Sequence, residues 1–139
     1  MDRNIVIVDS DSISAFILQR SLELLVPEQR FTINVVARLT DFHDDLTSSS
    51  GRNILENLHW VIIDTKYIWE ERPTLMDVLR FVRTHAPSLK LIITTEYFSK
   101  NLYHAILSEN LVDEIVIKPF GQDSLRKLVT CCREIHDIP

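Results

Sequence analysis

The strongest constraint in this sequence is a regular alternation of short apolar runs with longer stretches of helical pattern. The runs occupy residues 4–9, 31–39, 59–64, 89–95 and 114–118. Runs of this length that are rich in β-branched and aromatic residues are typical of buried strands. Repeated alternation of strand and helix predicts an α/β fold, in which a doubly wound, five-stranded parallel sheet carries helices on both faces.

Two of the predicted helical stretches carry particular expectations. Asp11 and Ser12 are suited to cap the first helix, because their side chains accept hydrogen bonds from free backbone N–H groups. Apolar residues at helical spacing are predicted to form the inward face of this helix: Ile13, Phe16, Ile17, Leu22, Leu24 and Leu25. Residues 41–58 are predicted as one interrupted helix, or as a helix followed by a loop and a final turn.

Length and composition narrow the class of protein. A chain of 139 residues is predicted to form one domain, and its net charge of −5 argues against nucleic acid as a direct partner, which needs clustered Lys and Arg. No apolar run is long enough to span a bilayer, and the N-terminus lacks the pattern of a signal peptide, so a cytoplasmic location is predicted. With only Gly51 and Gly121, the chain has no glycine-rich phosphate loop.

Polar side chains follow or end the predicted strands. In an open parallel sheet, ligands bind outside the carboxyl ends of the strands, and these side chains are expected to meet there. They are Asp9, Asp11, Asp64, Thr94, Thr95 and Lys118. The sequence therefore predicts carboxylates, a hydroxyl and an ammonium group along one edge of the sheet.

Taken in order, these residues resemble the signatures of a receiver domain of a two-component response regulator, which has the CheY-like fold. An acidic cluster follows the first run, Asp64 ends the sequence VIID, a Thr ends the fourth run, and IKPF occupies residues 117–120. The resemblance covers nearly the whole chain. It implies a flavodoxin-like sheet of order 2-1-3-4-5 in a single receiver-like domain spanning residues 1–139.

The resemblance also implies roles for individual residues. Asp64 would take a phosphoryl group from a phosphohistidine as an acyl phosphate, Thr95 would donate its hydroxyl to that group, and Lys118 would pair with it. Mg²⁺ would be held by Asp9, Asp64 and the backbone carbonyl of Lys66. The resemblance thus implies a signalling module that takes the phosphoryl group onto its own Asp, and not an enzyme.

The hydroxyl has two candidates in adjacent positions. The number of residues between the segment 83–87 and the end of the fourth run favours Thr95 as the site hydroxyl, and we assign Thr95 to the site. The family usually has a small residue directly after this hydroxyl, and Glu96 follows Thr95, so Thr94 stays as the alternative.

Two further positions depart from the family pattern. Ser10 stands where the family has a second acid that touches the metal, and the next acid of this chain is displaced to Asp11. Because a hydroxyl is a neutral ligand, Mg²⁺ binding is expected to be weak. Ile115 stands three residues before Lys118, where the family has an aromatic switch residue.

The partners that the resemblance implies are proteins. A histidine kinase or a phosphotransfer protein is the expected phosphodonor. A downstream protein, or a second copy of the chain as a homodimer, is expected to bind through three elements. These are the fourth predicted helix (residues 98–110), the fifth strand (residues 114–118) and the fifth predicted helix, which is capped at residue 123 or 124 and runs to about residue 136. Neither nucleic acid nor a membrane is expected as a direct partner, given the net charge of −5 and the short apolar runs.

Two other functions stay open at this point. The chain could keep the receiver fold and act as a binding module without phosphorylation, which Ser10, Glu96 and Ile115 favour. Alternatively, residues 5–13 resemble the Asp-x-Asp start of haloacid-dehalogenase-type phosphatases, with Asp9 as nucleophile and Asp11 as general acid/base. That interpretation gives no role to Asp64, and the segment after Lys118 lacks the second acidic pair of that family.

Overall fold

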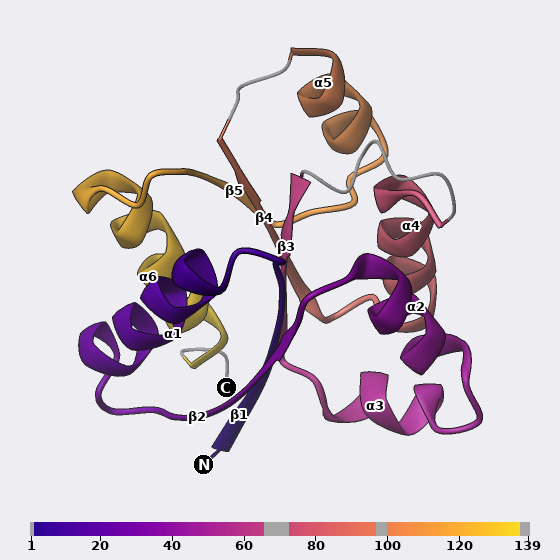
Figure 1. The fold of residues 1–139 in the computed structure, drawn as a ribbon, viewed down its shortest axis with the longest axis horizontal. Coiled ribbons are helices and arrows are strands. Elements are labelled where there is room, and N and C mark those ends of the chain that lie inside the picture. The colour runs from indigo at the N-terminus through magenta and orange to yellow at the C-terminus, as the bar shows by residue number, and fades with distance from the viewer. Residues whose placement is uncertain (1, 66–72, 97–99, 137–139) are drawn as a thin grey trace.

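The computed structural model of the chain describes residues 2–65, 73–96 and 100–136. Strands and helices alternate along these ranges (Figure 1). In chain order the elements are β1 (Asp2–Val8), α1 (Ser12–Leu25), β2 (Arg30–Val36), α2 (Leu39–Thr47), α3 (Gly51–Asn57), β3 (Trp60–Asp64), α4 (Leu75–His85), β4 (Lys90–Thr95), α5 (Lys100–Ser108), β5 (Glu114–Ile117) and α6 (Gln122–His136). The fourth and fifth predicted helices are therefore α5 and α6, because the second is divided into α2 and α3.

The strands form one parallel sheet in the order β2-β1-β3-β4-β5, which confirms the predicted fold class and strand order. Every connection between successive strands contains a helix. Pairing brings Val8 level with Ile63, and Asp64 level with Thr94. The carboxyl ends of β1, β3 and β4 therefore meet at one edge of the sheet, which we call the carboxyl edge; the opposite edge is the amino edge.

Helices cover both faces of the sheet and enclose two apolar cores. Figure 1 shows α1 and α6 on one face and α2, α3 and α4 on the other. Because successive strand residues point to opposite faces, β3 gives Trp60 and Ile62 to the first core and Val61 and Ile63 to the second. This double burial explains why β3 is apolar until Asp64, since a strand that is covered on both faces has no solvent side.

The buried face of α1 differs from the prediction. Ala15, Leu18 and Leu22 pack on the sheet, and of the six residues predicted to face inward only Leu22 is buried. The other five are exposed: Ile13 (70%), Phe16 (61%), Ile17 (43%), Leu24 (66%) and Leu25 (42%). The helix is apolar around most of its circumference, so its periodicity does not select one face. We call the exposed residues Ile13, Phe16, Ile17 and Leu24 the α1 stripe.

The predicted interruption between the second and third strands is confirmed. α2 ends at Thr47, and α3 begins at Gly51 after a short turn. Gly51 is buried, and a Cβ atom at this position would lie 1.8 Å from the carbonyl oxygen of Leu46. A side chain cannot fit there, so this glycine lets α3 pack closely against the end of α2.

Arg83 joins α4 to the strands that follow it. Its guanidinium donates to the carbonyl oxygens of Leu89 and Leu111, both at 2.9 Å, and to Asp113 Oδ2 at 3.1 Å. The same carboxylate oxygen accepts from the backbone N–H of Leu91 at 2.8 Å. These bonds fix the beginnings of β4 and β5 relative to each other, and thereby the register of the strand ends that carry the site.

Candidate functional site

Two buried carboxylates lie at the carboxyl edge. Asp64 is the last residue of β3 and is 5% exposed, and Asp9 follows β1 and is 2% exposed. The backbone N–H of Asp9 donates to the carbonyl oxygen of Val36 at 3.0 Å, so the strand geometry continues to the site. An ionised carboxylate is costly to bury unless a cation or several donors accompany it. Both positions therefore need a partner.

Lys118 is that partner. It follows β5, is 6% exposed, and its Nζ donates to Asp9 Oδ2 at 2.8 Å and to Asp64 Oδ2. The backbone N–H of Lys118 donates to the carbonyl oxygen of Thr95 at 2.7 Å, and the peptide bond between Lys118 and Pro119 is cis. Burial alone would lower the pKa of Lys118, but the hydrogen bonds to Asp64 and Asp9 outweigh it and raise the pKa above its usual value.

Thr94 brings a hydroxyl to Asp64. Its Oγ1 donates to Asp64 Oδ2 at 3.4 Å, and the two residues are paired in the ladder between β3 and β4. Thr95 is also buried, at 5% exposure, but successive strand residues point to opposite faces. The geometry thus points to the alternative Thr94 for this contact, whereas the role predicted for Thr95 stays a prediction.

Asp11 lies beside the site and serves as a helix cap. Its Oδ1 accepts from the backbone N–H groups of Ile13 at 3.0 Å and Ser14 at 3.3 Å, which matches the predicted cap. Its Oδ2 accepts from the hydroxyl of Ser14 at 3.0 Å. The hydrogen bond from the Ser14 side chain is the main cause that lowers the pKa of Asp11, and the backbone bonds add to it. Asp11 is exposed, and its backbone N–H donates to Asp9 Oδ1 at 2.9 Å.

The oxygen ligands at the carboxyl edge suit a hard cation. Asp9 and Asp64 both contact the Lys118 ammonium, so a divalent ion that replaced part of this contact would meet two carboxylates. Mg²⁺ is commonly held by one or two carboxylates together with water and phosphate oxygens. Among residues 2–65, 73–96 and 100–136, no group of three or more His, Cys, Asp or Glu forms a metal site. Lys66, the predicted carbonyl ligand, lies outside the described residues.

The surface predicted to bind a downstream partner is only partly apolar. On α5, Leu107 is 48% exposed, and on the edge strand β5, Ile117 is 44% exposed. Ile115, which occupies the position of the aromatic switch residue, is half-buried. Among the residues whose burial is described, the α1 stripe holds more exposed large apolar side chains than this surface does, and these side chains are the ones predicted above to face the core.

None of the helices in the described ranges combines the length and the apolar character that crossing a bilayer requires.

Several solved structures with the same fold are receiver domains. The isolated REC domain of RcsB from Salmonella enterica serovar Typhimurium, in the presence of phosphomimetic BeF3−, is 19% identical with a TM-score of 0.74, and the match covers 96% of this chain and 90% of that chain. A CheY-like receiver domain protein from Methanospirillum hungatei JF-1 is 18% identical with a TM-score of 0.72, covering 99% of this chain and 95% of that chain.

A response regulator from Thermotoga maritima is 17% identical with a TM-score of 0.68, and the match covers 97% of this chain and 98% of that chain. No protein-family model and no curated protein matches the chain. At these identities the likeness establishes the fold alone. The chain thus has the CheY-like receiver fold that the order of its strand-end residues predicts.

Proposed function

We propose that residues 1–139 form a single receiver domain of a response regulator in phosphorelay signalling, and that Asp64 accepts the phosphoryl group. The observation that carries the proposal is the buried group at the carboxyl edge. Lys118 Nζ joins the carboxylates of Asp64 and Asp9, and the hydroxyl of Thr94 donates to Asp64. Phosphoryl transfer depends mainly on positioning and on neutralisation of charge, and this group supplies both.

The chemistry requires one bond to form and one to break. An oxygen of Asp64 attacks the phosphorus of a phosphohistidine, the P–N bond breaks, and its electron pair returns to the imidazole, which takes a proton from solvent. The product is an acyl phosphate on Asp64. Lys118 is already placed beside the attacked carboxylate and offsets the negative charge that arrives with the phosphoryl group.

Mg²⁺ is the metal that fits the two carboxylates. Asp9 and Asp64 would hold it from side chains, and Lys66 would add its backbone carbonyl. When bound, the ion neutralises charge on the phosphoryl oxygens during transfer. Ser10 is exposed and offers only a neutral hydroxyl beside Asp9, so we propose weak binding.

We propose that the phosphodonor, a histidine kinase or phosphotransfer protein, docks on the α1 stripe. α1 begins three residues after Asp9, and its exposed Ile13, Phe16 and Ile17 lie on the first turns next to the carboxyl edge. A docked partner that covers these side chains would hold its phosphohistidine close to Asp64. A downstream protein or a second copy of the chain is proposed to bind the other surface, formed by α5, β5 and α6.

The decisive experiment is uptake of a phosphoryl group from acetyl phosphate. The protein is incubated with acetyl phosphate and MgCl₂, and its intact mass is measured. We expect one added phosphoryl group in the wild type and in Asp11→Asn, and none in Asp64→Asn. Peptide mapping then locates the label, and a label on Asp9 would exclude the proposed role of Asp64.

The structure also bears on the two alternative functions. A general acid in a phosphatase needs a raised pKa, whereas the cap bonds from Ser14 and Ile13 lower the pKa of Asp11. This weighs against Asp9 and Asp11 as a phosphatase pair. A receiver fold that binds partners without phosphorylation is favoured if acetyl phosphate leaves the mass unchanged in folded protein.

A further inference from the structure

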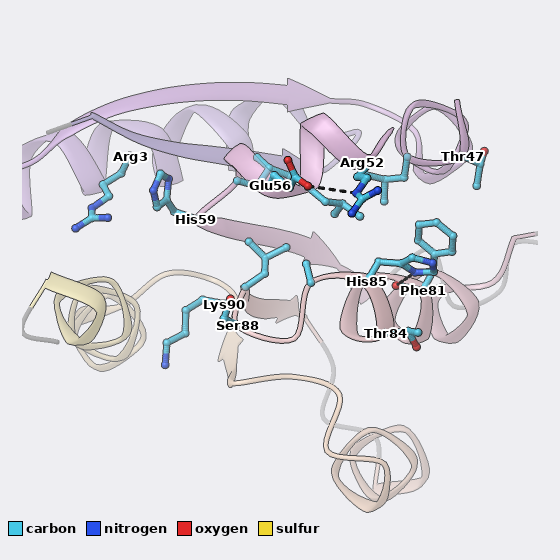
Figure 2. A pocket seen from close by; sticks show the side chains of 15 residues that line it. Arg3, Thr47, Arg52, Glu56, His59, Phe81, Thr84, His85, Ser88 and Lys90 are labelled. Atoms are coloured by element: carbon cyan, nitrogen blue, oxygen red, sulfur yellow. Dashed lines mark hydrogen bonds and ion pairs between the residues drawn. The ribbon is translucent and has the colours of Figure 1, made fainter. Parts of the chain in front are cut away.

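A hollow separate from the phosphoryl site lies at the amino edge of the sheet, away from Asp64. It is a groove of about 1160 Å³ between α2 and α3 on one side and α4 on the other. Figure 2 shows Arg3, His59 and Lys90 toward one end of it and Thr47, Phe81 and His85 toward the other. The wall formed by α2 and α3 depends on Gly51, because this glycine lets α3 pack closely against the end of α2.

The groove has an apolar floor and an open rim. Leu46, Leu55 and Leu89 are buried at its base, where they belong to the core under α2, α3 and α4. The rings of Phe81 and His85 stack at 4.2 Å and form a flat surface at one end. Residues along the rim are exposed: Thr47, Arg52, Glu56, Thr84, His85 and Ser88. An elongated ligand could thus lie on apolar side chains with its backbone still in water.

The charge of the groove is opposite to that of the chain. Arg3, Arg52 and Lys90 line it with Glu56, whereas the whole protein carries a net charge of −5. Nε of Arg3 is buried and has no hydrogen-bond partner within the described part of the chain. Arg3 as a whole is partly exposed and lines the groove, where its guanidinium adds positive charge. The pKa of the neighbouring His59 is lowered mainly by burial, and the positive charge of Arg3 lowers it further.

We propose that the amino-edge groove binds an acidic peptide segment of a partner protein. Apolar side chains of the segment rest on Leu46, Leu55 and Phe81, and its carboxylates lie near Arg3 and Arg52. Charge complementarity selects this occupant over a second copy of the acidic chain. The open rim suits a peptide, since an extended segment needs burial of its side chains on one face only. This surface is separate from the phosphoryl site and does not depend on the function proposed above.

The test is selection of peptides from a random library displayed on phage, with three forms of the protein as targets. The groove variant is Arg52→Glu/Thr84→Glu, which places negative charges on both walls at exposed helical positions. The matched control is Arg20→Glu/Thr130→Glu, which makes the same charge change at exposed positions of α1 and α6. Both arginines form an ion pair with a Glu of their own helix, Arg20 with Glu23 at 3.7 Å and Arg52 with Glu56 at 3.3 Å. Circular dichroism checks that all three forms are folded.

We expect the wild type and the control to enrich peptides that combine Asp or Glu with large apolar residues. The strongest peptide, labelled with a fluorophore, should bind the groove variant about tenfold or more weakly by anisotropy, and its Asn/Gln counterpart should bind the wild type with a similar loss. The proposal is overturned if the wild type enriches nothing, if neutral peptides bind equally well, or if the groove and control variants weaken binding alike. A dimer in sedimentation that the groove variant dissociates would assign the groove to a second copy instead.

Discussion

The two edges of the sheet carry charged groups in opposite surroundings. At the carboxyl edge, Lys118 and Asp9 form an ion pair of 2.8 Å in which the side chains are 5% and 1% exposed. At the amino edge, Arg52 and Glu56 form a pair of 3.3 Å in which the side chains are 92% and 64% exposed. The N–O distances of the two ion pairs are similar, so the pairs differ mainly in how deeply they are buried.

Burial changes what such a pair contributes. An exposed ion pair is worth about 0–1 kcal/mol, because water already solvates both charges. Removing one member of a buried pair leaves the other charged in a poor solvent, and this costs far more than the pair itself contributes. The carboxyl edge is therefore sensitive to substitution, whereas the amino edge can change its charges and stay folded. That contrast fits chemistry at one edge and tolerant peptide recognition at the other.

The largest expected effect comes from removing the buried ammonium. Lys118→Met leaves Asp9 and Asp64 uncompensated and should lower the free energy of unfolding by about 3–5 kcal/mol. Arg52→Met is the matched variant at the amino edge, and it should change the free energy by about 0.5 kcal/mol or less. Urea denaturation followed by circular dichroism measures both. Equal losses would show that burial does not distinguish the two edges.

The same pair of proteins has a defined pH dependence. Despite burial, the bonds to Asp64 and Asp9 raise the pKa of Lys118 above 10.5 in the folded chain. Its contribution is then fully present below pH 10.5 and is lost as the pH rises through the folded value. The difference in unfolding free energy between the wild type and Lys118→Met should therefore be constant at neutral pH and shrink in strong alkali.

The next effect compares two hydroxyls at the carboxyl edge. Thr94→Val removes the donor that contacts Asp64 and keeps the shape of the side chain, so phosphoryl uptake should slow at least about tenfold. Thr95→Val is the matched variant one residue later. Rates of uptake from acetyl phosphate, followed by intact mass, decide between the two. If uptake slows in Thr95→Val and is unchanged in Thr94→Val, the result would support the assignment of the site hydroxyl to Thr95.

These two residues show where sequence alone stops. The strand ends were predictable, because β-branched runs end abruptly at Asp64 and Lys118, and parallel strands bring their ends together. Which of two adjacent Thr side chains faces Asp64 depends on a register of one residue, and the sequence gives conflicting signals for it, because the spacing favours Thr95 whereas Glu96 directly after Thr95 favours Thr94.

The face of α1 escaped prediction for a different reason. Its apolar residues surround the helix, so only packing on the sheet could show that Ala15, Leu18 and Leu22 are the buried set. A helix with more apolar surface than the core can cover is itself a signal. Exposed apolar patches are typical of surfaces that another molecule covers, which is the basis for the docking site proposed above.

A smaller effect is expected at Ser10. Ser10→Asp adds a carboxylate beside Asp9 and should strengthen Mg²⁺ binding by roughly 1–2 kcal/mol, or about five- to thirtyfold. Ser88→Asp makes the same change at an exposed position of the amino-edge groove and should leave Mg²⁺ affinity unchanged. NMR titration with MgCl₂ compares the variants with the wild type. If Ser10→Asp binds no more tightly, the position beside Asp9 is not a ligand position.

The smallest effect separates burial from mere location. Asp11 lies at the carboxyl edge but is exposed, and its role is to cap α1. Asp11→Ala loses the cap bonds to Ile13 and Ser14 and should lower the melting temperature by about 2–6 °C, whereas Asp11→Asn keeps an acceptor and should lose less.

The cap also has a defined pH dependence. The bonds from Ser14 lower the pKa of Asp11 below 3.8, so the ionised side chain adds stability above pH 3.8. This stability is lost as the pH falls through the pKa of the folded state. The advantage of the wild type over Asp11→Asn should therefore disappear in acid. A loss in Asp11→Ala as large as that in Lys118→Met would mean that position at this edge, and not burial, sets the cost.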